Sequence, residues 1–143
     1  MKSQESRRYP IGKFEYGRTW SIDDTRRNIK AIARLPKDLK KALKKLKGSE
    51  MDMPYRRGGW TARQVVHHIV DSHMNAYVRM KLAVTEQTPI IKTYEEAQWA
   101  ETEDAKNASV KLSLKILSPL HKRWVMFLES LSEEDLERGY FHP

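Results

Sequence analysis

Residues 60–84 read WTARQVVHHIVDSHMNAYVRMKLAV, and this stretch decides the fold class. Thr61 followed by Gln64 forms a capping box, so a helix is expected to begin near Ala62 and to run to Val84. Its apolar side repeats at spacings of three, four and seven residues and is widened by three neighbours. The apolar residues are Val65, Ile69, Ala76, Met80 and Ala83, with Val66, Val70 and Tyr77 beside them. This pattern predicts an amphipathic helix that packs one side against other helices.

A second amphipathic segment precedes this stretch. Ser21, with Asp24 three residues later, is an N-cap candidate, and apolar residues then recur at helical spacing as far as Leu46. Pro36 falls inside the segment, which predicts either a kink or two abutting helices. Gly48 is the expected end of the helix.

A third amphipathic segment covers residues 109–131, with Pro119 inside it as a predicted kink or local break. Ser132 with Asp135 then caps a short last helix. Three long helices without a strand signal predict an all-α protein, a helix bundle of the up-down type. The 143 residues fit one domain. Residues 1–20 are expected to be an irregular N-terminal arm whose aromatic residues pack on the domain surface.

Composition narrows the classes of protein. The chain has no cysteine, which excludes disulfides, thiolate ligands and a cysteine nucleophile. The sequence lacks a run of about 20 apolar residues, so no membrane partner is expected, and without an export signal the expected compartment is the cytoplasm. The net charge is +8, but the lysines gather on one side of the segment 37–47. A solvated face explains them better than nucleic-acid binding does, because no nucleic-acid motif accompanies them.

The five histidines are the first candidates for chemistry: His67, His68, His73, His121 and His142. Three of them lie in the 60–84 helix, where each residue advances about 100° around the axis. His73 then falls on the apolar stripe, where it is expected to be a hydrogen-bonded core histidine. His68 falls at the margin of the stripe, either packed or a ligand, and His67 points away as a surface residue beside Asp71.

His121 lies in the apolar stripe of the third helix, where a buried histidine with a partner across the bundle is expected. The alternative for His121 is a functional role, either beside a metal ligand or as a metal ligand itself. The spacings of five and six residues between the histidines of the 60–84 helix do not provide the two-ligand pattern H-x-x-x-H. Any metal would therefore need further ligands from another element.

Several segments together resemble the DinB/YfiT-like family of metal-dependent hydrolases, which is related to the bacillithiol and mycothiol S-transferases. The segments are Arg56–Tyr77, Arg79–Pro89, Tyr94–Trp99, Leu120–Trp124, Arg138–Pro143 and Tyr9–Gly12. The resemblance implies a four-helix bundle that holds one divalent metal, zinc or nickel, through three histidines. It assigns one ligand to His68, whereas periodicity makes His73 the most buried candidate.

The other two ligands implied by the resemblance form an H-x-x-x-H pair on a last helix, and these 143 residues contain no such pair. The chain is therefore expected to lack that helix, and the metal could be lost together with it. The further site candidates are His73, His67, Asp71, His121, Tyr94 and Trp99 as pocket residues or neighbours of the metal ligand.

A metal held in this way would activate water or a thiol. The implied partner is thus a small-molecule substrate, with a low-molecular-weight thiol as one form of it. A non-catalytic helical binding module that has lost the metal is the alternative. Three amphipathic helices without a fourth leave a groove of apolar surface, so a homodimer is expected.

Overall fold

The computed structural model describes residues 4–17 and 19–143. Helices dominate the fold. They are α1 (Gln4–Arg8), α2 (Ile22–Leu43), α3 (Ala62–Thr85), α4 (Glu96–Trp99), α5 (Glu103–Asn107), α6 (Val110–Glu129) and α7 (Glu133–Leu136), with a 3-10 helix, η1 (Gly48–Asp52), between α2 and α3. In these described residues, β pairing is limited to two isolated bridges. The predicted all-α class is confirmed.

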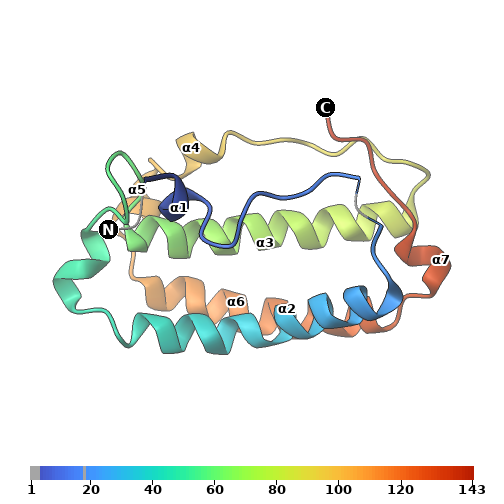
Figure 1. The fold of residues 1–143 in the computed structure, drawn as a ribbon, viewed down its shortest axis with the longest axis horizontal. Coiled ribbons are helices and arrows are strands. Elements are labelled where there is room, and N and C mark those ends of the chain that lie inside the picture. Colours follow the sequence, from blue (N-terminus) through green and yellow to red (C-terminus); the bar gives the residue numbers. More distant parts are fainter. Residues whose placement is uncertain (1–3, 18) are drawn as a thin grey trace.

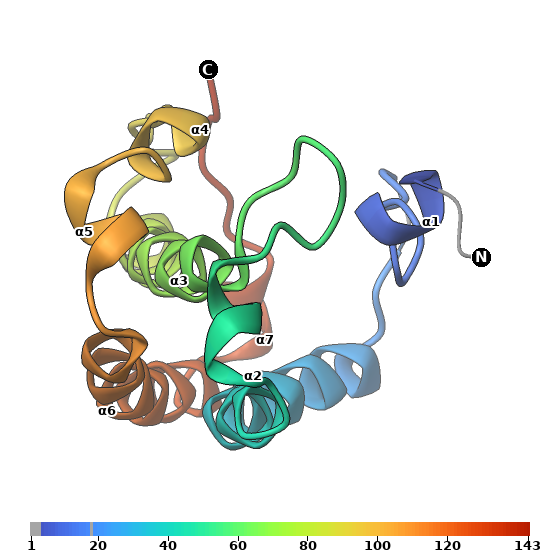
Figure 2. The same cartoon turned by 90° about the vertical axis from the view of Figure 1, so that its left-hand side faces the viewer.

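The three long helices α2, α3 and α6 form the body of the molecule (Figure 1). Seen from the end, α2 and α6 lie side by side with α3 above them (Figure 2). The core between them is built mainly by α3 and α6, through Val66 and Val70 on one side and Leu117, Trp124 and Leu128 on the other. None of the residues of α2 is fully buried. The bundle is therefore covered less completely on the side of α2 than between α3 and α6.

Three helix starts follow the predicted capping chemistry. Ser21, Thr61 and Ser132 each accept a hydrogen bond from the backbone N–H three residues later, and the side chain at that position bonds back to the cap. Each such cap satisfies amide groups that the first helical turn leaves unpaired. The amino ends of α2, α3 and α7 are thus fixed by local sequence.

Other local predictions were wrong or incomplete. α2 ends at Leu43 rather than at Gly48, which instead opens η1. α2 and α6 each continue as one helix through Pro36 and Pro119, which excludes two abutting helices at Pro36 and a local break at Pro119. The arm is not wholly irregular, because residues 4–8 form α1, in which an acidic first turn and a basic last turn complement the helix dipole.

The arm also packs less than its aromatic residues predicted. Ile11 and Tyr16 are 98% and 91% exposed, and Phe14 is exposed as well. Phe14 and Tyr16 contact one another edge to face rather than the core, with ring centroids 5.0 Å apart. The expectation that the aromatic residues of the arm pack on the domain surface is therefore wrong for Phe14 and Tyr16.

The long segment between α3 and α6 lies on the side of α3 that faces away from α2 and α6 (Figures 1 and 2). Its start is paired with the C-terminal segment: the Ile91 N–H donates to the Phe141 carbonyl at 3.1 Å, and the Phe141 N–H donates to the Pro89 carbonyl at 2.9 Å. Ile91 is buried as a result. This segment thus forms a second layer over α3.

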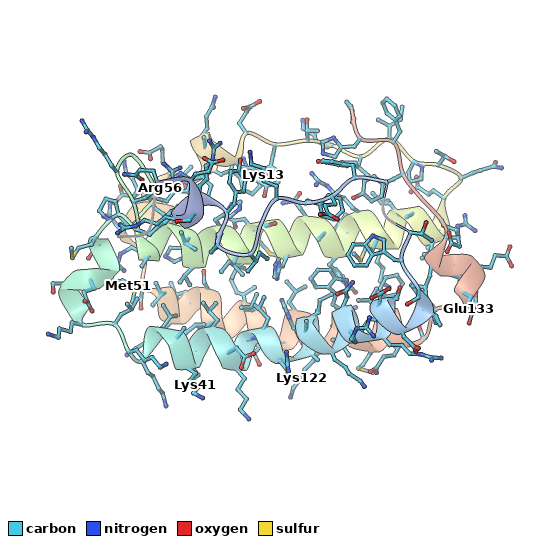
Figure 3. The ribbon with its side chains drawn as sticks, viewed as in Figure 1. Lys13, Lys41, Met51, Arg56, Lys122 and Glu133 are labelled. Carbon is cyan, nitrogen blue, oxygen red and sulfur yellow. The ribbon has the colours of Figure 1, made fainter. Side chains whose placement is uncertain are left out.

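The lysines occupy the outer surface of the bundle. Lys41 on α2 and Lys122 on α6 point away from α3 into solvent (Figure 3). Among the described residues, no helix combines the length and apolar character that crossing a membrane requires.

Candidate functional site

His67 is buried rather than solvent-facing, so the sequence-based prediction was wrong. Its side chain is 7% exposed. Nε2 lies 3.1 Å from the Ala108 carbonyl and Nδ1 lies 2.7 Å from the Ser113 hydroxyl. A carbonyl only accepts, so Nε2 donates to it and Nδ1 accepts from the serine. Both ring nitrogens are used, which leaves His67 no lone pair for a metal.

The reason lies in the packing of the second layer. Arg63 donates to the same Ala108 carbonyl at 2.9 Å, and the Gln64 amide donates to the Ala100 carbonyl at 2.7 Å. These hydrogen bonds hold the segment of α5 and the start of α6 against the side of α3 that carries His67. The predicted contact of His67 with Asp71 is replaced by these partners.

His121 is buried with partners on both other long helices, as expected. It is 2% exposed, its Nδ1 lies 2.7 Å from the Ile32 carbonyl of α2, and its Nε2 lies 2.8 Å from His73 Nδ1 of α3. The Ile32 carbonyl is available because Pro36, four residues later, has no N–H to donate to it. Pro36 therefore provides an acceptor for His121 in the middle of α2.

This contact fixes the protonation of both rings. The Ile32 carbonyl only accepts, so His121 carries its proton on Nδ1 and its Nε2 accepts from His73 Nδ1. His73 Nε2 is then unprotonated, and it makes no hydrogen bond within the described ranges. Burial, reinforced by the charges of His121 and His68, lowers the pKa of His73 to about 4. Burial likewise lowers the pKa of His121, against an opposing effect of the Ile32 carbonyl. Both rings are neutral at pH 7.

His68 differs from these three histidines. Neither of its ring nitrogens makes a hydrogen bond to any described residue, and neither is among the buried atoms without a partner. The half-buried ring packs against Trp60, with ring centroids 4.7 Å apart. His68 therefore has a lone pair that a ligand from solvent can reach.

Asp71 stands close to this ring. Burial raises the pKa of Asp71, the Asp104 carboxylate adds to the increase, and the charges of His68 and His67 oppose it. A carboxylate that is partly buried and near an unpaired imidazole is typical of functional sites. His68 and Asp71 are the two groups on the side of α3 that carries His68 that could bind a cation.

Tyr94 and Trp99, the aromatic candidates of the second layer, lie together. Their ring centroids are 4.5 Å apart, and the Arg79 guanidinium lies 5.9 Å from the centre of the Tyr94 ring. Arg79 also donates to the Lys92 carbonyl at 2.9 Å. Sequence reasoning did not single out Arg79, although helical spacing places it on the same side of α3 as His68.

The donor set for a metal is incomplete among these residues. No group of three or more histidine, cysteine, aspartate or glutamate side chains converges within residues 4–17 and 19–143. Three or four such ligands are needed for a stable zinc site. His68, Asp71 and Nε2 of His73 are free to bind a metal, but they do not converge into a group of three, so the described residues fit part of a metal site and not a whole one.

An all-α bundle with a solvent-reachable histidine on an inner helix is the architecture in which helical proteins build metal and ligand sites from facing side chains. The sequence model of the DinB superfamily matches residues 31–143, and the chain belongs to this superfamily.

Relatives extend the match to most of the chain. Two proteins named "Putative metal-dependent hydrolase", from Bacillus cereus strain B4264 and Bacillus anthracis strain A0248, are each 54% identical over 136 residues, which are 95% of this chain and 78% of the relative. The solved structure of YfiT from Bacillus subtilis, described as "a probable metal-dependent hydrolase with an unusual four-helix bundle topology", superposes with a TM-score of 0.92 at 43% identity. That match covers 96% of this chain and 79% of YfiT. The predicted DinB/YfiT-like assignment is thereby confirmed.

Proposed function

We propose that this chain acts in metal-dependent hydrolysis, with His68 as one ligand of a single zinc or nickel ion. The observation that carries the proposal is the contrast among the histidines of the bundle. His67 and His121 use both ring nitrogens within the protein and His73 uses one, whereas His68 uses neither. Membership of the DinB superfamily and the names of the relatives supply the chemistry. The described residues contain no group of three or more candidate ligands, so the proposal requires further ligands besides His68.

The substrate we propose is a small molecule bound on the face of α3 that carries His68. The chain has no cysteine, so a thiol nucleophile would have to come from a co-substrate, and metal-activated water is the other nucleophile we propose. A low-molecular-weight thiol is therefore a second candidate class. His73, Asp71 and Tyr94 stand in this proposal as pocket residues around the ligand.

Metal analysis tests the proposal. Protein expressed from the complete reading frame, whether or not it extends beyond these 143 residues, is purified from medium supplemented with zinc and nickel. We expect a metal content near one ion per chain, and loss of about nine tenths of it in His68→Ala, because one of about three ligands is removed. His142→Ala is the matched control, since His142 is exposed, and it should retain the metal.

Two outcomes would contradict the proposal. The first is a metal-free wild type after growth with both metals, which would favour the alternative of a non-catalytic binding module. The second is equal metal content in wild type and His68→Ala, which would place the ion elsewhere. Elemental analysis by mass spectrometry measures both.

We also propose that the chain forms a homodimer. The apolar stripe of α2 is nowhere fully buried, and Ile32, Leu35 and Leu39 remain half-buried. Apolar surface that stays partly open on a soluble domain is commonly covered by a partner. A second copy of the chain offers the same stripe and can cover it reciprocally.

Light scattering at micromolar concentration is expected to give twice the chain mass of 16.8 kDa. Leu39→Glu should shift the mass to that of one chain, because it places a charge in the covered stripe. Lys41→Glu, on the exposed side of the same helix, is the control and should leave the dimer intact. A single-chain mass for the wild type would overturn this proposal.

A further inference from the structure

Two neighbouring side chains beside α3 have polar atoms without a partner. The Nε of Arg79 and the hydroxyl of Tyr94 are both buried, and neither makes a hydrogen bond within the described part of the chain. An unpaired buried donor is costly, so folded proteins keep few of them. Two such donors next to each other indicate a place where an acceptor from outside the chain binds.

The surrounding contacts hold both side chains in place. Arg79 Nη2 donates to the Lys92 carbonyl at 2.9 Å, and its guanidinium carbon lies 5.9 Å from the centre of the Tyr94 ring. Trp99 packs on that ring with a centroid distance of 4.5 Å. None of the ion pairs formed by described residues involves Arg79. The guanidinium is thus fixed in position while its charge has no carboxylate partner.

The pair lies on the face of α3 that carries His68. Helical spacing places His68, Ser72, Asn75 and Arg79 within a sector of about 60°. The Ser72 hydroxyl lies beside the Tyr94 hydroxyl and lowers its pKa, although the two groups do not meet the geometry of a hydrogen bond. Ser72 follows His68 by one turn, about 6 Å along the axis. Arg79 lies a further seven residues, about 10 Å, along the axis, so a small molecule that extends from the Arg79 guanidinium past Tyr94 would approach the His68 ring.

The chemistry of the two groups selects the ligand. The guanidinium is always charged and offers only donors. Burial raises the pKa of Tyr94, and the Glu96 carboxylate adds to the increase, so the hydroxyl keeps its proton at neutral pH. Carboxylates match a guanidinium with two parallel hydrogen bonds. The charges of Glu96 and Asp71 near Tyr94 favour a single negative charge over the double charge of phosphate.

We propose that Arg79 and Tyr94 form a binding site for the carboxylate of a small-molecule ligand on the His68 face of α3. As the anchor of a hydrolase substrate, the site rests on the proposed function. As a carboxylate site it needs no metal, so metal-free protein tests it independently. Absence of metal from the protein would leave this site untouched, and absence of carboxylate binding would leave the metal proposal untouched.

The test titrates metal-free, ¹⁵N-labelled protein with sodium acetate, with ionic strength held constant by sodium chloride. The indole N–H signal of Trp99, which packs on Tyr94, reports binding in every variant. We expect a saturable shift with acetate and at least a tenfold loss of affinity in both Tyr94→Phe and Arg79→Lys. Tyr55→Phe, which removes the hydroxyl of a partly exposed tyrosine before α3, is the matched control and should bind acetate as the wild type does.

Several results would overturn the site. They are a shift that does not saturate, equal affinity in wild type and Tyr94→Phe, and tighter binding of inorganic phosphate than of acetate. Thermal unfolding adds a readout that separates ligand binding from support of the fold. A hydroxyl without a protein partner can be removed without loss, so Tyr94→Phe should melt at the wild-type temperature or above it. A decrease of about 4 °C or more would assign the hydroxyl to the fold and contradict the proposal.

Discussion

Replacing His121 with alanine is expected to lower the free energy of unfolding by about 3 kcal/mol. The substitution leaves the Ile32 carbonyl and His73 Nδ1 without their partners at 2.7 Å and 2.8 Å. It also opens a space beside Trp124, whose ring centroid lies 5.5 Å from that of His121. Urea unfolding followed by circular dichroism at pH 7 measures the change. His142→Ala removes an exposed histidine and should change the value by less than about 0.5 kcal/mol.

Pro36 allows a sharper form of the same prediction. Pro36→Ala gives α2 an N–H that can donate to the Ile32 carbonyl, so this carbonyl no longer depends on His121. His121→Ala should therefore cost less in the Pro36→Ala background than in the wild type, with a coupling energy of at least about 1 kcal/mol. Strictly additive free energies would show that the link between Pro36 and His121 does not support the fold.

The long helices could be predicted from the sequence because residues close together in the chain determine where each helix begins and which side of it packs. The pairs Ser21–Asp24 and Thr61–Gln64 fix helix starts within four residues, and the apolar repeat fixes which side of each helix packs. The position of His121 in the apolar stripe of its helix likewise predicted a buried residue with a partner across the bundle.

The site was less predictable because its contacts join distant parts of the chain. His67 is buried by Ala108 and Ser113, more than 40 residues away. Which side of α3 the second layer covers does not follow from the periodicity of α3 itself. The same holds for Tyr94, which meets Arg79 only because the layer runs back along the helix. One signal was present in the sequence: Pro36 frees the carbonyl of Ile32 in any helix that contains both.

Asp71 shows how local sequence and contacts with distant residues together determine the properties of the site. Helical spacing places its carboxylate on the outer side of α3, where an isolated helix would leave it in solvent. The second layer brings Asp104 near it and buries it in part, which raises its pKa. The face that carries His68 is thus built by α3, but its electrostatic character is set by the segment between α3 and α6.

Acidification from pH 7 to pH 5 is expected to destabilise the protein through His73. The unfolded imidazole takes up its proton near pH 6.5 and the folded one near pH 4. Between these values the unfolded state binds more protons, so lower pH favours unfolding. The contribution of His73 is complete above pH 6.5 and is lost by about pH 4. Because the ring is only half-buried, we expect a loss of about 1 kcal/mol at pH 5, less than a full conversion of the pKa shift would give.

Two measurements separate His73 from the other titrating groups. In nuclear magnetic resonance spectra, the ring signal of His73 should titrate with a midpoint near pH 4, and a midpoint near 6.5 would refute the prediction. In urea unfolding, His73→Gln should lose about 1 kcal/mol less than the wild type between pH 7 and pH 5, while His142→Gln should follow the wild type.

The carboxyls whose pKa is lowered by hydrogen bonds titrate below 3.8 and lie outside this interval. They are Asp24, Asp52, Asp104 and Asp135. Asp71 titrates closer to the interval, but with its pKa raised it acts in the opposite direction, since folding favours its protonated form. The pKa of His121 is lowered too, so His121 acts in the same direction as His73. A difference between wild type and His73→Gln in this interval therefore reports the hydrogen-bonded pair of neutral rings that His73 and His121 form.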